Sequence, residues 1–353
     1  MKRAKKLLLL SSSLVILCLL TFWLNSLNLN DLEEDTDTPA TTIFSLDTDT
    51  ITSLSWTYEE DTLTFTYDNG QWTYAEDDSF PVDRSILDNM ASTLNDISST
   101  KSILNVEDFS QYGLDAAACT ISVTTDTTYE IQVGNETGLG SEYYLSIGDG
   151  NVYLVNSGFL DSFTYSLYDC LEEETIPTMS DIDSINIVTK THTLELYHDK
   201  ESTLTAEDGT AYFWFAKTEA GNIALDTTYV DSFVSTLTGL SFLECIDYKA
   251  DADALAAYGL LDPIATATIN YVETTEVDTG ETDENGINIF EYEETIHTLV
   301  LEIGDYYDNY NYIRIQGSSM VYLIDASICD TILQTTYEAL LPVEETEDAE
   351  GTT

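Results

Sequence analysis

Histidine is the first residue type to examine for chemistry, because its imidazole acts as a general base or a metal ligand near neutral pH. The chain has three histidines, at positions 192, 198 and 297. His192 and His198 flank two leucines at even spacing, which places both on one face of a predicted strand. Six residues of strand span about 20 Å, too far for the two side chains to share a metal ion. With His297 isolated, we expect histidines at the surface or at the edge of a core, and no metal or cofactor.

Cysteine offers disulfides, metal binding or a nucleophile. Besides Cys18 near the N-terminus, the chain holds Cys119, Cys170, Cys245 and Cys329, with no C-x-x-C pair. Four cysteines in an exported chain allow two disulfides, in three pairings. Cysteine is also often buried as a free thiol. We favour buried free thiols, because a chain of 353 residues can build a core without cross-links.

The carboxylates are too numerous to single out a catalytic pair. With 65 Asp and Glu residues, close pairs arise by chance, and a glycosidase needs a defined separation between two of them. The sequence contains no G-x-S-x-G, phosphate loop, dinucleotide fingerprint or D-x-D-x-D-G calcium loop. We therefore predict no catalytic residue and a non-catalytic binding or scaffold module. The alternative is a carboxylate-dependent hydrolase acting on cell-wall polymer.

Tyrosines gather near two predicted turns and form a candidate partner surface. Clustered tyrosine can bind a glycan or a protein, because each ring offers an apolar face and a polar end. The alternative is strand packing, which tyrosine also favours. The residues concerned are Tyr143, Tyr144, Tyr306, Tyr307, Tyr310 and Tyr312.

The charge balance excludes several partners. Only 11 Lys and Arg oppose 65 acidic residues, for a formal net charge of −54. Such a surface repels nucleic acid and anionic headgroups, and it attracts cations and basic polypeptides in a salt-dependent way. The chain is nonetheless not disordered in composition, because 43% of it is hydrophobic and it carries 23 tyrosines.

The N-terminus predicts attachment to a membrane. Four of the basic residues lie within positions 1–6, and residues 7–24 carry no charge. As a helix this run spans about 27 Å, close to one hydrocarbon core. We expect a single-pass anchor with 1–6 in the cytoplasm and the acidic remainder outside, joined by an acidic linker over 25–42. A cleaved signal peptide and lipoprotein processing at Cys18 are the alternatives.

A repeated motif organises the rest of the chain. Tyr112-Gly113-Leu114-Asp115 recurs as Tyr258-Gly259-Leu260, followed by Asp262 and Pro263. Each glycine is predicted to end a short helix in the left-handed conformation, with the following leucine making an apolar contact. The helices before the two motifs also match, at a constant offset of 143 residues from Asp83 to Asp226. We read two copies of one domain, because so long a period indicates tandem domains rather than a solenoid.

The first copy is predicted over 43–177. Period-two alternation indicates strands near 51–58, 63–67, 72–74, 120–123, 129–133, 143–147 and 152–155. One helix begins at Asp83 and presents Ile86, Leu87, Met90, Leu94 and Ile97, and 107–112 can form a short helix. A closing helix from 156 or 157 presents Leu160, Phe163, Leu167 and Leu171.

The second copy is predicted over 178–342 with the same order of elements. It carries an acidic insertion at 272–296 with Glu284-Asn285-Gly286 at its centre, which predicts a lengthened hairpin projecting from the sheet. Its closing helix presents Ile328, Ile332, Leu333 and Leu340, and an acidic tail follows at 343–353. The predicted fold class is therefore α+β: an N-terminal transmembrane helix and two repeats of mainly antiparallel sheet, each with two main helices.

These elements resemble the domain-of-unknown-function 4340 family of bacterial envelope proteins. The residues that carry the resemblance include 70–73, the two motifs at 112–115 and 258–263, the strand ends 131–134 and 301–304, and Val152-Tyr153-Leu154. The resemblance implies a membrane-tethered extracytoplasmic protein, often encoded beside ABC-type transporter subunits and gliding-motility-like proteins. It therefore implies transporter subunits or another envelope protein as partners, and it supplies no catalytic residues.

Overall fold

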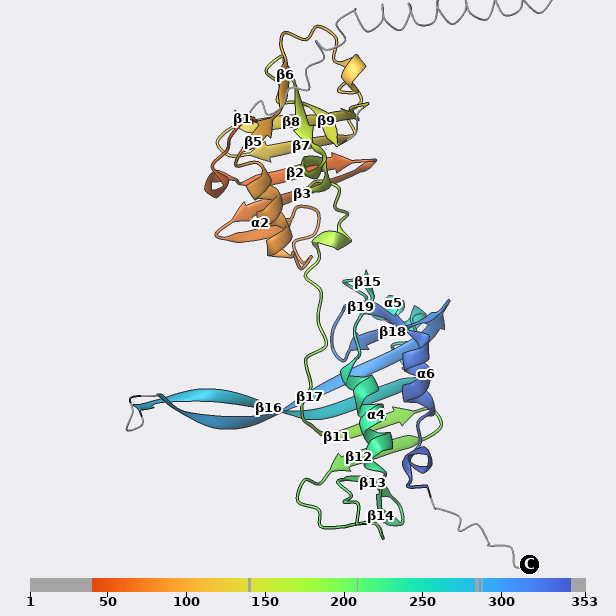
Figure 1. Ribbon diagram of the computed structural model, residues 1–353. Helices are drawn as coiled ribbons and strands as arrows, with labels where there is room; N and C mark the ends of the chain where they lie inside the picture. The colour runs from red at the N-terminus through yellow and green to blue at the C-terminus, as the bar shows by residue number, and fades with distance from the viewer. Residues whose placement is uncertain (1–39, 139–140, 208, 283–285, 287, 344–353) are drawn as a thin grey trace, which may run out of the picture. The chain divides into compact units, whose positions relative to one another are not determined.

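The computed structural model describes residues 40–138, 141–207, 209–282, 286 and 288–343 (Figure 1). The chain divides into two compact units. Unit 1 takes Met1–Glu76 and Arg84–Leu167, and unit 2 takes Asp77–Asp83 and Tyr168–Thr353.

Unit 1 is built on an eight-stranded sheet with the order β4-β3-β2-β7-β8-β9-β10-β6, and a separate pair joins β1 to β5. All of these pairs are antiparallel. The strands are β1 (Thr41–Phe44), β2 (Ser53–Tyr58), β3 (Asp61–Asp68), β4 (Gln71–Tyr74), β5 (Ile97–Ser99), β6 (Lys101–Ile103), β7 (Cys119–Thr124), β8 (Thr128–Glu136), β9 (Glu142–Ser146) and β10 (Val152–Asn156). The helices are α2 (Arg84–Thr93) and α3 (Ser157–Asp161), with 3-10 turns η2 (Thr48–Thr50) and η3 (Ser110–Tyr112).

Unit 2 is built on a nine-stranded antiparallel sheet with the order β14-β13-β12-β11-β16-β17-β18-β19-β15. Its strands are β11 (Ile182–Thr189), β12 (Thr193–His198), β13 (Trp214–Thr218), β14 (Gly221–Ala224), β15 (Glu244–Asp247), β16 (Ala265–Thr282), β17 (Asn288–Tyr307), β18 (Tyr310–Ile315) and β19 (Val321–Asp325). The helices are α4 (Thr227–Thr238), α5 (Ala252–Ala257) and α6 (Ala326–Gln334), with 3-10 turns η4 (Tyr168–Cys170) and η5 (Tyr337–Leu340).

The two sheets have the same strand order. The run β4-β3-β2-β7-β8-β9-β10-β6 of unit 1 corresponds to β13-β12-β11-β16-β17-β18-β19-β15 of unit 2, where β14 is added at one edge. This shared order agrees with the repeat seen in the sequence.

Local chemistry explains the hairpins and the helix that covers the unit 2 sheet. Asn69 and Gly70 both have positive φ, at 50° and 84°, which is the backbone of the tight turn that joins twisted antiparallel strands such as β3 and β4. Asp226 caps α4, because its carboxylate accepts the backbone N–H groups of residues 228 and 229. The helix then lies on the sheet (Figure 1) and buries Val230, Phe233 and Leu237.

The predicted α+β class, with a transmembrane helix and two main helices per repeat, is wrong. The described residues are mostly antiparallel strand with five α-helices, of which the longest, α4, has 12 residues. None of the helices formed by these residues is long and apolar enough to cross a membrane. The predicted anchor at 7–24, nearly all of the linker at 25–42 and all but one residue of the acidic tail lie outside the described residues.

The helix predictions failed where apolar spacing reflected burial rather than helical geometry. The predicted closing helix of the first copy is the five-residue α3, which ends at Asp161. Phe163 and Leu171 are nevertheless buried, although the chain that carries them is not helical. Ile97 is also buried but begins β5, four residues after α2 ends. A 3.6-residue spacing of apolar side chains is necessary for an amphipathic helix and is not sufficient.

Candidate functional site

The repeated glycine motif of unit 2 joins the end of α5 to β17. Gly259 has φ 71°, in the left-handed region, and a Cβ there would lie 2.5 Å from the carboxylate carbon of Asp305. A Cβ on Gly304 would lie 2.3 Å from the carbonyl oxygen of Tyr258. That carbonyl accepts the N–H of Asp305 at 2.9 Å. Two glycines thus allow two backbone segments to touch.

Unit 1 repeats the same contact. Gly113 ends η3 with φ 73°, and a Cβ on Gly134 would lie 2.2 Å from the carbonyl oxygen of Tyr112. The leucines after the two left-handed glycines, Leu114 and Leu260, are both buried. We call Gly113 with Gly134, and Gly259 with Gly304, the glycine pairs. Their contacts are structural, and they explain why the motif recurs.

The acidic residues of the motif lie at the surface. Asp115 is exposed, and the exposed Asp262 forms an ion pair with Lys190. Pro263, half-buried, follows directly and leads into β16.

The predicted tyrosine surface separates into packed and exposed members. Tyr144 packs against Tyr112 with ring centroids 4.9 Å apart, and Tyr312 packs against Tyr258 at 4.8 Å. Tyr143 and Tyr310 are half-buried. Tyr306 and Tyr307, at the end of β17, are exposed. Those two are the exposed members of the set, although Tyr307 also stacks on Tyr312 with ring centroids 5.6 Å apart, and their role in binding stays a prediction.

The three histidines have separate surroundings. The imidazole of His192 hydrogen-bonds the carbonyl oxygen of Thr335 at 3.1 Å. The imidazole of His297 lies 2.9 Å from the carboxylate of Glu273. His198 stacks on Trp214, with ring centroids 4.7 Å apart. Across the part of the chain that the structure describes, no three His, Cys, Asp or Glu side chains are placed to hold a metal ion.

The four described cysteines are free and buried, as predicted. Burial raises the pKa of each thiol from its usual value near 9 to about 12, because the apolar surroundings disfavour the thiolate. Such thiols are poor nucleophiles and poor metal ligands at neutral pH. They act as small apolar side chains.

Alkaline pH is expected to destabilise the chain through these thiols. Well below pH 9 the thiols are protonated in both the folded and the unfolded chain, so their contribution to the free energy of unfolding is complete. Between pH 9 and 12 the unfolded chain releases protons that the folded chain keeps, so the free energy of unfolding falls by about 1.4 kcal/mol per thiol and pH unit. Urea unfolding at pH 8, 9 and 10 measures this slope. Cys119→Ala removes one of these thiols, so the fall in the free energy of unfolding with pH should become less steep. An unchanged slope would contradict the raised pKa of Cys119.

One buried carboxylate is held by a charged partner. The side chain of Glu302, in β17, accepts hydrogen bonds from the guanidinium of Arg314 at 2.6 Å and the amide of Gln316 at 3.0 Å. Arg314 also donates to the carbonyl oxygen of Ser318 at 3.2 Å. Only 10% of the Glu302 side chain is exposed. These groups satisfy one another, so Glu302 is a structural carboxylate in the sheet.

The predicted acidic insertion is a two-stranded arm. Beyond Val272 and before His297, β16 and β17 pair only with each other, and Figure 1 shows them leaving the sheet as a twisted ribbon. We call residues 273–295 the arm, of which 283–285 and 287 are not described. Almost every described side chain of the arm is exposed. A hairpin without a further strand or helix buries too little to be stable by itself, so its base in the sheet must hold it.

One face of the arm and its base combines apolar and acidic side chains. Phe290 is opposite Asp278 and Tyr292 is opposite Glu276, so each ring has a carboxylate directly across the ribbon. Ile296 lies on the same face at the base, and Tyr292 is 70% exposed and Ile296 67%. The sequence predicted the hairpin but did not identify these side chains. Their alternation with acidic residues in 288–296 was the available signal.

The fold and these surfaces define a class of protein with two antiparallel β units. Within each unit a glycine pair lets the end of a short helix contact a strand, and the second unit carries the projecting arm. The chain belongs to the family of the domain of unknown function DUF4340, which matches residues 72–212 and 214–340. The division between the two matches lies between β12 and β13, inside unit 2, and so differs from the division between the compact units. No curated protein matches the chain, and no solved structure matches it.

Proposed function

We propose that this chain is a non-catalytic binding protein that docks through its arm onto a basic, arginine-bearing protein surface. The observation that carries the proposal is the face on which Phe290 and Tyr292 each lie across from a carboxylate. An aromatic ring beside a carboxylate suits a guanidinium, which stacks on the ring and hydrogen-bonds the acid.

The charge of the arm supports a basic partner over a second copy of this chain. The sequence has no Lys or Arg between Lys249 and Arg314, while the arm is rich in Asp and Glu. The chain as a whole carries a formal net charge of −54. Two such chains repel each other at moderate ionic strength, whereas a basic surface is attracted.

We further propose that the two units lie outside the cytoplasm and that the partner belongs to a membrane complex. The support is the basic segment at 1–6, the uncharged run at 7–24, and the resemblance to envelope proteins encoded beside ABC-type transporter subunits. A transporter subunit with a basic extracytoplasmic face is the partner class that fits this combination. Protease accessibility in intact cells tests the location.

Shortening the arm is expected to abolish docking and leave the fold intact. Residues 275–293 are replaced by Asn-Gly, so that Thr274 and Glu294 stay paired across a two-residue turn. Proteins retained by the immobilised full chain from solubilised envelope, and identified by mass spectrometry, should be lost. Because the contact is electrostatic, the same proteins should be released from the full chain as salt rises from about 0.05 to 0.5 M.

Two matched variants give the control. Phe290→Ser with Tyr292→Ser removes the rings and keeps the acids, and should lose the same proteins. Leu204→Ser with Leu243→Ser removes two exposed apolar side chains outside the arm and should retain the same proteins. If the shortened chain still retains the same proteins, or if no basic protein depends on the arm, the docking proposal is wrong.

A further inference from the structure

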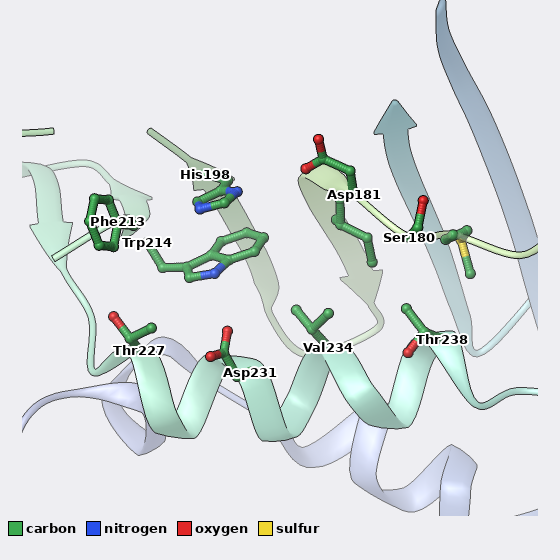
Figure 2. Close-up of a pocket in the computed structure, with 11 residues that line it drawn as sticks. Ser180, Asp181, His198, Phe213, Trp214, Thr227, Asp231, Val234 and Thr238 are labelled. Carbon is green, nitrogen blue, oxygen red and sulfur yellow. The ribbon is translucent and has the colours of Figure 1, made fainter. Parts of the chain in front are cut away.

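A cavity opens in unit 2 between α4 and the strands β11 to β13. Its volume is about 410 Å³, within the range of small-molecule sites. Figure 2 shows Thr227 and Asp231 projecting from α4 toward the indole of Trp214, with His198 stacked on the other side of that ring. Asp181 lies at the start of β11, on the same cavity.

In unit 1, hydrogen-bonded side chains occupy the position that corresponds to this cavity. The indole N–H of Trp72 donates to one carboxylate oxygen of Asp88 at 2.9 Å, and the guanidinium of Arg84 donates to the other at 2.9 Å. Tyr67 packs on the indole with ring centroids 4.8 Å apart. We call Trp72, Asp88 and Arg84 the closed bridge, in which every group has a partner.

The correspondence between the two places rests on register and on sequence offset. Tyr67 is opposite Trp72 in β3 and β4, and His198 is opposite Trp214 in the matching strands β12 and β13. On the helices, the offset of 143 residues takes Asp88 to Asp231 and Arg84 to Thr227. Unit 2 therefore keeps the tryptophan and the aspartate of the bridge and replaces the arginine with a threonine.

The groups that the bridge would satisfy are left open in unit 2. The hydroxyl oxygen of Thr227 is buried and has no hydrogen-bond partner in the described part of the chain. In the described part of the chain, the indole N–H of Trp214 and the carboxylate of Asp231 form no bridge like that between Trp72 and Asp88, and Asp231 is exposed to solvent. Because a buried polar atom without a partner costs about 1–3 kcal/mol, the hydroxyl of Thr227 favours an occupant of the cavity that hydrogen-bonds it.

We propose that this cavity binds a neutral polyhydroxylated ligand, a mono- or disaccharide. The indole N–H of Trp214 only donates, so the ligand must present an acceptor. The carboxylate of Asp231 only accepts, so the ligand must also present a donor. A sugar hydroxyl does both and can bridge the two groups, while a sugar ring packs on aromatic side chains.

Other ligand classes fit the cavity less well. The carboxylate of Asp231 opposes an anion at this cavity, whereas the carboxylate of Asp181 is already paired with the ammonium group of Lys200. An ammonium ion donates only and leaves the indole N–H of Trp214 unpaired. The site lies on other elements than the arm, so this proposal does not depend on docking.

Saturation-transfer NMR and isothermal titration on the full chain test the proposal. The probes are glucose, galactose, N-acetylglucosamine and maltose. At least one is expected to bind. Trp214→Phe, which keeps a ring and removes the N–H donor, should weaken that binding about tenfold, as expected for the loss of about 1.4 kcal/mol. Trp72→Phe makes the same chemical change in unit 1 and should leave the affinity unchanged.

The sharpest variant rebuilds the closed bridge in unit 2. Thr227→Arg places the arginine of unit 1 beside Asp231 and should abolish sugar binding while keeping or raising the melting temperature. Failure of all four sugars to bind overturns the proposal, as does equal loss in Trp72→Phe and Trp214→Phe. Choline serves as a cationic probe. Tighter binding of choline than of any sugar, lost in Asp231→Asn, would reassign the cavity to a cation.

Discussion

Gly304→Ala is expected to destabilise unit 2 by about 3 kcal/mol, because the new methyl group meets backbone rather than a movable side chain. Its Cβ would lie 2.3 Å from the carbonyl oxygen of Tyr258 and 3.0 Å from the side chain of Leu260. Relief requires the end of α5 to move away from β17. Urea unfolding measures the loss, and the melting temperature of the unit should fall by about 6–12 °C.

Substitution of two other glycines distinguishes the destabilisation caused by a close contact from that caused by backbone strain. Gly280, in the arm, has φ 73° with nothing within 4 Å of its Cβ position, so Gly280→Ala carries only the left-handed strain of about 1 kcal/mol. Gly259 combines φ 71° with a contact to Asp305, and Gly259→Ala should cost more than Gly280→Ala. If Gly304→Ala proves no more destabilising than Gly280→Ala, the backbone contact of the glycine pair is not tight.

Arg314→Met should also destabilise unit 2 by about 3 kcal/mol, since it leaves the carboxylate of Glu302 buried without its cation. Most of that cost comes from the unpaired charge. The double variant Glu302→Leu with Arg314→Met removes both charges, and its free energy of unfolding is expected to return to within about 1 kcal/mol of the original. Chemical denaturation of the three chains provides the measurement.

An exposed ion pair provides the comparison. The amine of Lys217 lies 2.6 Å from the carboxylate of Glu195, with about half of each side chain exposed (53% and 43%). Lys217→Met should change the free energy of unfolding by less than about 1 kcal/mol. Equal costs for Lys217→Met and Arg314→Met would mean that burial does not govern the strength of the Glu302 pair.

The sequence predicted those features that local chemistry decides. The left-handed Gly113 and Gly259, the cap at Asp226 and the hairpin around 272–296 follow from backbone freedom, side-chain capping and turn composition. The repeat was visible because both copies need the same glycines.

The sequence failed where tertiary packing decides. Phe163 and Leu171 have helical spacing, yet both are buried in chain that is not helical. The cavity was missed because His198 and Trp214 come together only through strand pairing. The offset of 143 residues does align Arg84 with Thr227 in the sequence, and it indicates that unit 2 has a threonine where unit 1 has the arginine.

The four free thiols determine how the described fold responds to reductants and oxidants. The described residues contain no disulfide, so a reductant has no cross-link to break among them. Thiols with a pKa near 12 also resist oxidation and exchange, because little thiolate forms. The described parts of the two units are therefore expected to keep the same fold with and without a thiol reductant.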